Sequence, residues 1–186
     1  MVEQGQKTVA VYCGACHAAP VYETAAADFG RLLAQKGYRL LYGGSDTGTM
    51  ATLANAFLDA GGYAIGVSSE AICQRAPINA RCQEKIVVKN LAERKAYMFT
   101  HADAVVALPG AVGTLDELFD AGARRKVETP SIRVGALNVD GFYDPLILLR
   151  ERMRGAGFIH RWAKGCIIIR SNPETLLHKL LDTPLK

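Results

Sequence analysis

The chain has 186 residues, of which 49% are hydrophobic and 22% charged, and its formal net charge is +4 with a pI of about 8.8. This mixture is typical of a globular protein and excludes a disordered chain, a coiled coil and a collagen; the length predicts a single domain over residues 1–186. The positive charge is mild and spread along the sequence, with no dense basic arm. It suits small anionic ligands and predicts no nucleic-acid partner.

Neither a secretory signal pattern nor an apolar run approaching the roughly 20 residues that span a bilayer is visible in the sequence. We therefore expect a cytoplasmic protein without membrane contact. The five cysteines are odd in number and irregularly spaced, so we expect reduced thiols rather than a disulfide framework. They are Cys13, Cys16, Cys73, Cys82 and Cys166.

Short β-branched runs alternate with longer amphipathic stretches, which predicts repeated βα units and a parallel sheet. The expected strands are Thr8–Tyr12, Arg39–Tyr42, Ala64–Val67, Lys85–Val88, Asp103–Leu108 and Ile132–Leu137. The expected helices are Pro20–Lys36, Thr49–Ala60, Leu91–His101, Thr114–Arg125 and a last helix from the N-cap Asn172 to about Leu181. The segment Ser68–Gln83 is irregular, and its length and Pro77 predict a lid or a short helix.

Two glycine-rich loops each follow a predicted strand and precede a predicted helix. Ligands of open α/β sheets bind at the carboxyl ends of the strands, and glycines let backbone N–H groups approach a phosphate. Neither loop has the Walker A or the full dinucleotide spacing, and each alone is equally consistent with a tight turn that needs positive φ. Two such loops on neighbouring strand ends predict one shared anion site. Its predicted residues are Gly43, Gly44, Gly48, Thr49, Met50, Gly110, Ala111, Val112, Gly113 and Thr114.

Three charged residues near predicted helix starts are candidates for chemistry. Glu117 lies one turn into the helix after the second loop, where a carboxylate either offsets the helix dipole or faces the sugar of a bound nucleotide. Arg94 and Lys95 begin another helix, and two cations there oppose the helix dipole. Such a local conflict indicates a functional position, although a solvated helix face is the alternative for both residues.

These segments together resemble the LONELY GUY (LOG) family, formerly described as possible lysine decarboxylases and now associated with cytokinin riboside 5′-monophosphate phosphoribohydrolase activity. The resemblance runs from about Thr8 to about Leu181. Its most specific part is Pro109-Gly110, Gly113-Thr114 and Glu117, which resemble the family signature PGGxGTxxE. The other matching segments are Val11–Gly14, Tyr42–Gly44 with Gly48 and Met50, Gly62–Val67, Arg94-Lys95 with Met98, and Leu137–Pro145.

The resemblance implies a Rossmann-like homodimer that cleaves the N-glycosidic bond of a nucleoside 5′-monophosphate, releasing the base and ribose 5-phosphate. It implies Arg94 and Glu117 as the catalytic pair, with Lys95 and the two glycine loops binding phosphate and ribose, and neither a metal nor a redox cofactor. The chain departs from the family pattern at Ser45, Ala92 and Ala111, and the helix after Glu117 lacks the expected tryptophan and glutamine and looks about one turn shorter. These departures leave the identity of the base open.

Four other interpretations are set against this one. Cys13-Gly14-Ala15-Cys16-His17 formally matches a redox C-x-x-C and a haem-attachment C-x-x-C-H, but neither explains the glycine loops. The stronger alternative is a non-catalytic carrier of a nucleotide or pterin-type phosphate on the same fold, favoured by Ala111 if that position needs positive φ. A decarboxylase would need a pyridoxal phosphate lysine, and the sequence identifies none.

Overall fold

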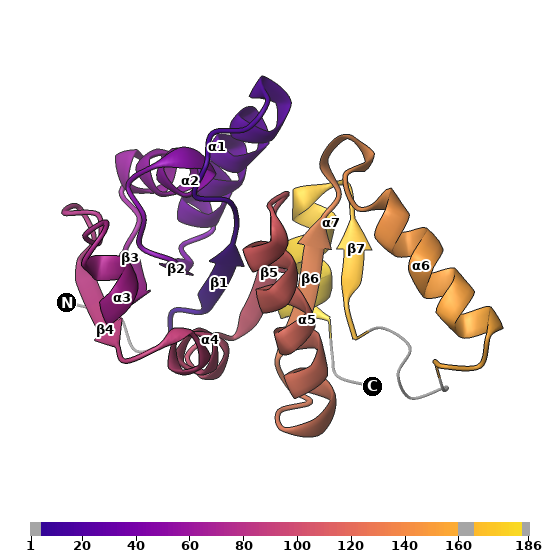
Figure 1. The fold of residues 1–186 in the computed structure, drawn as a ribbon. Coiled ribbons are helices and arrows are strands. Elements are labelled where there is room, and N and C mark those ends of the chain that lie inside the picture. The colour runs from indigo at the N-terminus through magenta and orange to yellow at the C-terminus, as the bar shows by residue number, and fades with distance from the viewer. Residues whose placement is uncertain (1–4, 160–165, 184–186) are drawn as a thin grey trace.

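The computed structural model describes residues 5–159 and 166–183 of the chain. Within them, seven strands form one sheet in the order β4-β3-β2-β1-β5-β6-β7, and every pairing is parallel. Helices cover both faces of this sheet (Figure 1). The predicted α/β fold of three layers around a parallel sheet is thus confirmed.

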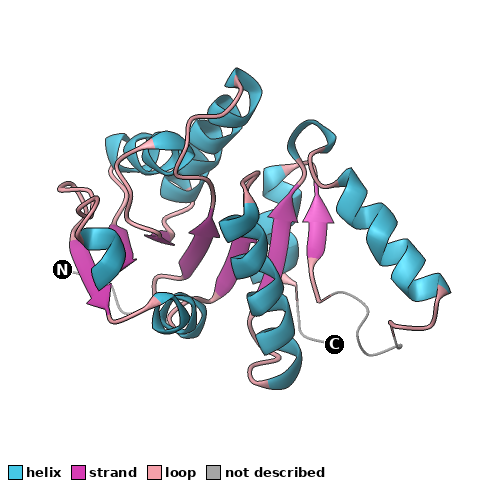
Figure 2. Cartoon of the chain, in the orientation of Figure 1, coloured by secondary structure: helices cyan, strands magenta, loops and turns pink. Residues whose placement is uncertain are grey.

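The elements alternate along the chain as the sequence predicts (Figure 2). The strands are β1 (Thr8–Tyr12), β2 (Arg39–Tyr42), β3 (Ala64–Ser69), β4 (Glu84–Val88), β5 (Ala104–Ala107), β6 (Arg133–Leu137) and β7 (Ile168–Arg170). The α-helices are α1 (Pro20–Gln35), α2 (Gly48–Asp59), α3 (Glu70–Cys73), α4 (Leu91–Thr100), α5 (Val112–Val127), α6 (Asp144–Gly155) and α7 (Pro173–Leu177). A 3-10 turn, η1 (Val139–Gly141), precedes α6, and a π-helical turn, η3 (His178–Asp182), extends α7. No helix in these ranges is both long and apolar enough to cross a bilayer.

Most differences from the predicted elements lie at their ends. α5 begins at Val112 rather than Thr114, and the last helix changes to π-helical geometry at His178. The segment predicted as a lid or short helix extends β3 by two residues and then forms the short helix α3. These are the positions where turn geometry and packing, rather than local pattern, set the boundary.

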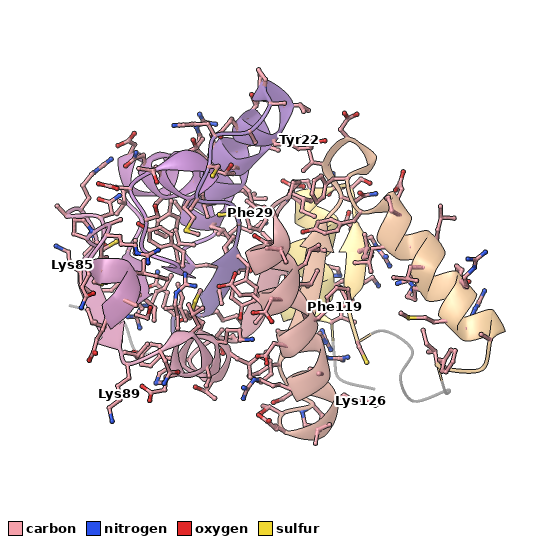
Figure 3. The ribbon with its side chains drawn as sticks, in the orientation of Figure 1. Tyr22, Phe29, Lys85, Lys89, Phe119 and Lys126 are labelled. Atoms are coloured by element: carbon pink, nitrogen blue, oxygen red, sulfur yellow. The ribbon has the colours of Figure 1, made fainter. Side chains whose placement is uncertain are left out.

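The core consists of two apolar layers, one on each face of the sheet. In β1, Val9 and Val11 pack in the cluster that contains α1, α2 and α7, whereas Ala10 and Tyr12 pack in the cluster that contains α4 and α5. Phe29 of α1, labelled in Figure 3, is fully buried in the first layer. A central strand buried on both faces needs apolar residues throughout, which explains the continuous apolar runs of the sequence.

The order of the strands corrects one prediction about the site. The two glycine loops follow β2 and β5, which are not neighbours: β1 lies between them and pairs with both. The strand order reverses between β1 and β5, the point at which such sheets bind ligands. The loop after β1 therefore separates the two glycine loops and forms the middle of the site.

The segment between β6 and α6 is held by Asn138, which gives a stability prediction. Its buried side chain accepts a hydrogen bond from the Tyr143 N–H (2.7 Å) and donates one to Asp144 Oδ1 (2.8 Å). Asn138→Ala leaves the buried Tyr143 N–H without an acceptor, so we expect the free energy of unfolding to fall by about 1–3 kcal/mol. Urea denaturation measures this, with Asn55→Ala on α2 as the control. Equal stability of the two variants would contradict the role given to Asn138.

Candidate active site

A pocket of about 170 Å³ lies over the carboxyl ends of β1 and β5 and is lined by both predicted catalytic residues and by four of the predicted phosphate- and ribose-binding residues. Three loops and two helices contribute to it. It is lined by Cys13, Gly14, Ala15, Met50, Arg94, Ala111, Gly113, Thr114 and Glu117. We call it the central pocket.

Arg94 and Glu117 form a buried ion pair in the central pocket. Nη1 of Arg94 donates to Oε1 of Glu117 over 2.9 Å, and each residue is only 8% exposed. The Arg94 Nε–H donates to the carbonyl of Val67, within β3, over 2.9 Å. The guanidinium is therefore held from two sides, and the second Glu117 oxygen, Oε2, has no hydrogen bond to another described residue. The structure thus brings together the two residues that sequence reasoning singled out separately.

Burial changes the acidity of Glu117. Burial raises the pKa of its carboxyl, and Asp116 adds to the increase, while the Arg94 and Lys95 cations oppose it; the net shift is upward. A carboxylate with a raised pKa is a better proton acceptor than an exposed one. This combination of burial and a specific charge partner is typical of functional carboxylates.

The two cations at the start of α4 are explained by two parallel ion pairs with α5. While Arg94 binds Glu117, the neighbouring Lys95 binds the neighbouring Asp116, with Nζ 2.9 and 3.0 Å from its two oxygens, and lies 3.8 Å from Asp120. Lys95 lines neither the central pocket nor the pockets beside it. The structure therefore does not place Lys95 where a phosphate or ribose contact was predicted, and its ammonium instead joins α4 to α5.

The first glycine loop also differs from its predicted role. The Thr49 N–H donates to the carbonyl of Cys16 (3.2 Å), and the Met50 N–H donates to that of Gly14 (3.0 Å). The start of α2 is thus satisfied by the loop after β1, and these two amides are not free for an anion. Gly48 has φ +62°, and a Cβ there would lie 2.4 Å from the Ala15 carbonyl, so this loop is packed against its neighbour.

Gly43 makes room for the Arg94 guanidinium. A Cβ on Gly43 would lie 2.2 Å from Nη2 of Arg94 and 2.8 Å from Sδ of Met50, both far inside van der Waals contact. The residue is a glycine because of this close approach, since its φ is not in the left-handed region. Gly44, with φ +79°, lines the pocket next to the central one.

The second glycine loop leaves the N-terminus of α5 free. The N–H groups of Val112, Gly113 and Thr114 have no acceptor among the described residues, and the first bonded amide is that of Leu115, which donates to Ala111. N–H groups without an acceptor among the described residues, at the start of a 16-residue helix, are the arrangement that favours an anion, together with the helix dipole. Ala111, the N-cap, has φ −84°, so alanine in place of glycine carries no backbone strain here.

The loop after β1 contributes residues that we did not predict as site residues. Cys13, Gly14 and Ala15 line the central pocket because β1 lies between the two glycine loops. Burial raises the pKa of the Cys13 thiol, opposite to the shift of an activated redox cysteine. Across residues 5–159 and 166–183 no three His, Cys, Asp or Glu side chains are grouped to hold a metal.

The raised pKa of Glu117 predicts the pH dependence of the site. If the carboxylate is the active form, the acidic limb of kcat/KM lies above the ordinary glutamate pKa of about 4.3. Arg94→Gln removes an influence that lowers this pKa, so the limb moves further up in that variant. A pH–rate profile with an acidic limb at or below 4.3 would contradict the assignment.

The same shift affects the stability of the protein. In the native state the Glu117 carboxyl binds a proton more readily than in the unfolded state, so its stabilising contribution is present at low pH and is lost as pH rises through the native pKa.

A family model described as "Possible lysine decarboxylase" matches residues 50–180. The chain belongs to this family. Its LOG-family relatives include "Cytokinin riboside 5′-monophosphate phosphoribohydrolase LOG" of Oryza sativa subsp. japonica, 35% identical over 175 residues, which are 94% of this chain and 72% of the relative. Another relative with this activity in its name, from Arabidopsis thaliana, is 32% identical over 181 residues (97% and 79%). The resemblance to the LOG family is therefore confirmed.

Solved structures support the fold of this LOG-family chain. The molybdenum cofactor binding protein from Rippkaea orientalis matches with a TM-score of 0.70 at 23% identity, covering 92% of this chain and 93% of that one. The molybdenum cofactor carrier protein from Chlamydomonas reinhardtii matches with a TM-score of 0.67 at 19% identity, covering 91% and 92%. At these identities the likeness shows a shared Rossmann-like fold.

Proposed function

We propose that the protein hydrolyses the N-glycosidic bond of a nucleoside 5′-monophosphate, releasing the free base and ribose 5-phosphate. The observation that carries this proposal is the buried pair of Arg94 and Glu117 beside three free amides of α5. An anion site next to a buried carboxylate suits a substrate that carries a phosphate at one end and develops positive charge at its sugar. The names of the LOG-family relatives support the same activity.

The α5 amides would hold the phosphate, and the rest of the helix then places the carboxylate. Thr114 and Glu117 are three residues apart, so Glu117 lies about 4.5 Å further along the helix axis, on the sugar side of the phosphate. Phosphate binding is remote from the bond that breaks and so supplies energy to position the sugar. Arg94 fixes Oε1 of Glu117, which leaves Oε2 to face the reacting carbon.

In the reaction, the bond between C1′ and the base nitrogen breaks with its electron pair leaving on the base. The sugar passes through an oxocarbenium-like state, which the Glu117 carboxylate stabilises. Water adds to C1′ and gives one proton to Glu117. The departing base takes up one proton from solvent, and Glu117 returns its proton to solvent, so one water is consumed for each bond broken.

The carrier alternative loses part of its support in the structure, because Ala111 adopts an ordinary backbone conformation. A buried carboxylate beside a phosphate site has no evident use in a protein that only binds an anion. Pyridoxal phosphate chemistry needs a lysine at the cofactor, and no lysine is found among the described residues that line the central pocket and its two neighbours.

The direct test is base release by the purified protein from a panel of nucleoside 5′-monophosphates, including AMP and isopentenyl adenosine monophosphate. We expect release of a base and ribose 5-phosphate in equal amounts from at least one of them, and none from the corresponding nucleosides, which lack the phosphate. Nucleotide binding in a calorimeter without release of any base would overturn the hydrolase and favour the carrier.

We also propose a homodimer, as the LOG resemblance implies. Exposed apolar side chains gather on α5, on α6 and directly after α6, where Phe119, Met153 and Phe158 line a cavity of about 290 Å³. Apolar surface of this kind marks an interaction site. We expect Phe119→Asp to yield a monomer in analytical ultracentrifugation. Leu58→Asp is unsuitable as a control, because Leu58 packs against the core and the substitution would disturb folding. A wild-type monomer at micromolar concentration would contradict the proposal.

A further inference from the structure

The loop after β1, residues 13–19, is shaped by contacts with other segments rather than by regular structure of its own. The carbonyls of Gly14 and Cys16 accept N–H groups from the first turn of α2. The N–H groups of Gly14 and Ala15, which line the central pocket, have no acceptor among the described residues. The conformation of this loop therefore decides which of its donors face a ligand in the central pocket.

Glu23, in the first turn of α1, bonds to the end of this loop and to α2. Its Oε1 accepts the Ala18 N–H over 2.9 Å, and this amide has no other acceptor in the described part of the chain. The Thr49 hydroxyl lies between the same oxygen (3.2 Å) and the carbonyl of Cys16 (3.3 Å), so it joins the carboxylate to the loop. The second oxygen, Oε2, accepts the Thr52 hydroxyl. One carboxylate thus connects α1, α2 and the loop after β1.

We propose that Glu23 is a positioning residue of the active site, which holds the loop after β1 in the conformation that binds the substrate. The inference rests on the proposed function. It concerns a side chain that lines neither the central pocket nor the two pockets beside it. Glu23 acts through the loop and does not touch the reacting atoms.

The surroundings of Glu23 suit an ionised carboxylate. Burial raises the pKa of its carboxyl, but the hydrogen bonds from Thr52, Ala18 and Thr49 outweigh burial, so the net shift is downward. Hydrogen bonds to a charged acceptor are stronger than those between neutral groups. His17 lies 3.7 Å from Oε1, but its side chain is 81% exposed, so this ion pair adds little. The three hydrogen bonds therefore fix the loop.

The alternative is that Glu23 only joins α1 to α2, which lie side by side (Figure 1). These helices have a close-packed contact of their own, about two turns away from Glu23. A Cβ on Gly30 of α1 would lie 2.4 Å from the Leu53 carbonyl of α2, and Phe29 and Phe57 are fully buried in the same core layer. The helix pair does not depend on Glu23, whereas the Ala18 end of the loop does.

The test compares Glu23→Ala with the wild type on the nucleoside 5′-monophosphate that the wild type hydrolyses. Alanine releases the loop, so only a fraction of the molecules hold the binding conformation, and the apparent affinity falls by that fraction. We expect KM to rise at least about tenfold and kcat to stay within about twofold, because the pair of Arg94 and Glu117 is unchanged once substrate is bound. Hydrogen exchange of the Ala18 amide, followed by NMR, should become faster.

Glu23→Gln is expected to rescue the site. Its oxygen can accept the Ala18 N–H, and its amide can donate to the Thr52 hydroxyl, which then donates to the carbonyl of Gly48 (3.4 Å). Neutral hydrogen bonds are weaker than those to a carboxylate, so KM should return to within about threefold of the wild-type value. A purely structural carboxylate would show lower stability in urea without this effect on KM.

Asp28→Ala is the matched control, because it removes an exposed carboxylate from the same helix, and it should leave KM unchanged. Unchanged KM in Glu23→Ala, whatever its stability, would overturn the inference and leave the hydrolase intact, and so would a Glu23→Gln variant as impaired as Glu23→Ala. If Glu23→Ala fails to fold, Thr52→Val, which removes one hydrogen bond at equal volume, should raise KM about threefold, and unchanged KM there would overturn the inference. A wild type that releases no base from any nucleoside 5′-monophosphate would instead overturn the proposed function, and the inference with it.

Discussion

Glu117→Gln is expected to lower the rate of base release by about 10²–10⁴-fold, the range typical for loss of a general base. Glutamine has nearly the same shape and keeps an oxygen that accepts the hydrogen bond from Arg94 Nη1, so the pocket should retain its geometry. What disappears is the negative charge that stabilises the sugar cation and accepts a proton from water. Single-turnover base release measures the effect on chemistry, and calorimetry measures nucleotide binding separately.

The matched control is Glu128→Gln, at the C-cap of the same helix, where the carboxylate is exposed and bonded to Arg124. It removes an equal charge from α5 far from the pocket and should release base at the wild-type rate. Glu117→Gln keeps the hydrogen bond from Arg94 but leaves that buried guanidinium without its counter-ion, so urea denaturation of the variant checks that it is folded under the assay conditions. Wild-type turnover in Glu117→Gln would show that the chemistry lies elsewhere.

Gly43→Ala is expected to lower activity by about 10²-fold through a single added methyl group. The new Cβ would lie 2.2 Å from Arg94 Nη2, so the guanidinium must move, and a displacement of about 1 Å in a catalytic site costs on the order of 10²-fold in rate. The same overpacking should lower the free energy of unfolding by about 1–3 kcal/mol. Base release and urea denaturation of the same preparation separate the two effects.

Gly155→Ala on α6 serves as the control for Gly43→Ala. A Cβ at Gly155 would have no described atom within 4 Å, and its φ is not in the left-handed region, so activity and stability should both be retained. Full activity of Gly43→Ala would mean that the observed position of the Arg94 guanidinium is not the catalytic one.

The elements of the fold were predictable from sequence because their signals are local. Continuous apolar runs mark strands buried on both faces, as β5 is, and helical spacing marks the face of α1 that Phe29 and Leu33 bury. Asn172 with Pro173 marked the start of α7, where the Asn172 side chain indeed accepts the Thr175 N–H. Boundaries were less accurate, because hydrogen bonds to other segments move them by one or two residues.

The candidate catalytic residues could also be singled out from the local sequence, but the side chains that they contact could not. Arg94 and Lys95 at the start of α4 are unfavourable for the helix dipole. In the structure they form ion pairs with carboxylates of α5 that lie more than 20 residues further along the chain. The sequence did not predict that Arg94 would pair with the buried carboxylate, Glu117, and Lys95 with the exposed one, Asp116. That choice depends on the rotation of each helix against the sheet.

The two glycine loops show most clearly what tertiary structure alone decided. By sequence they were equivalent, each with glycines before a helix. Because β1 lies between β2 and β5, its loop reaches the start of α2 and occupies the amides of Thr49 and Met50 with carbonyls, while the first amides of α5 have no acceptor in the described part of the chain. The sequence by itself determined the βα repeats and the family and singled out Arg94 and Glu117 as candidates, since these signals depend on neighbours along the chain. Which backbone donors remain open to a ligand depended on strand order, because only contacts between distant segments satisfy a helix end or leave it free.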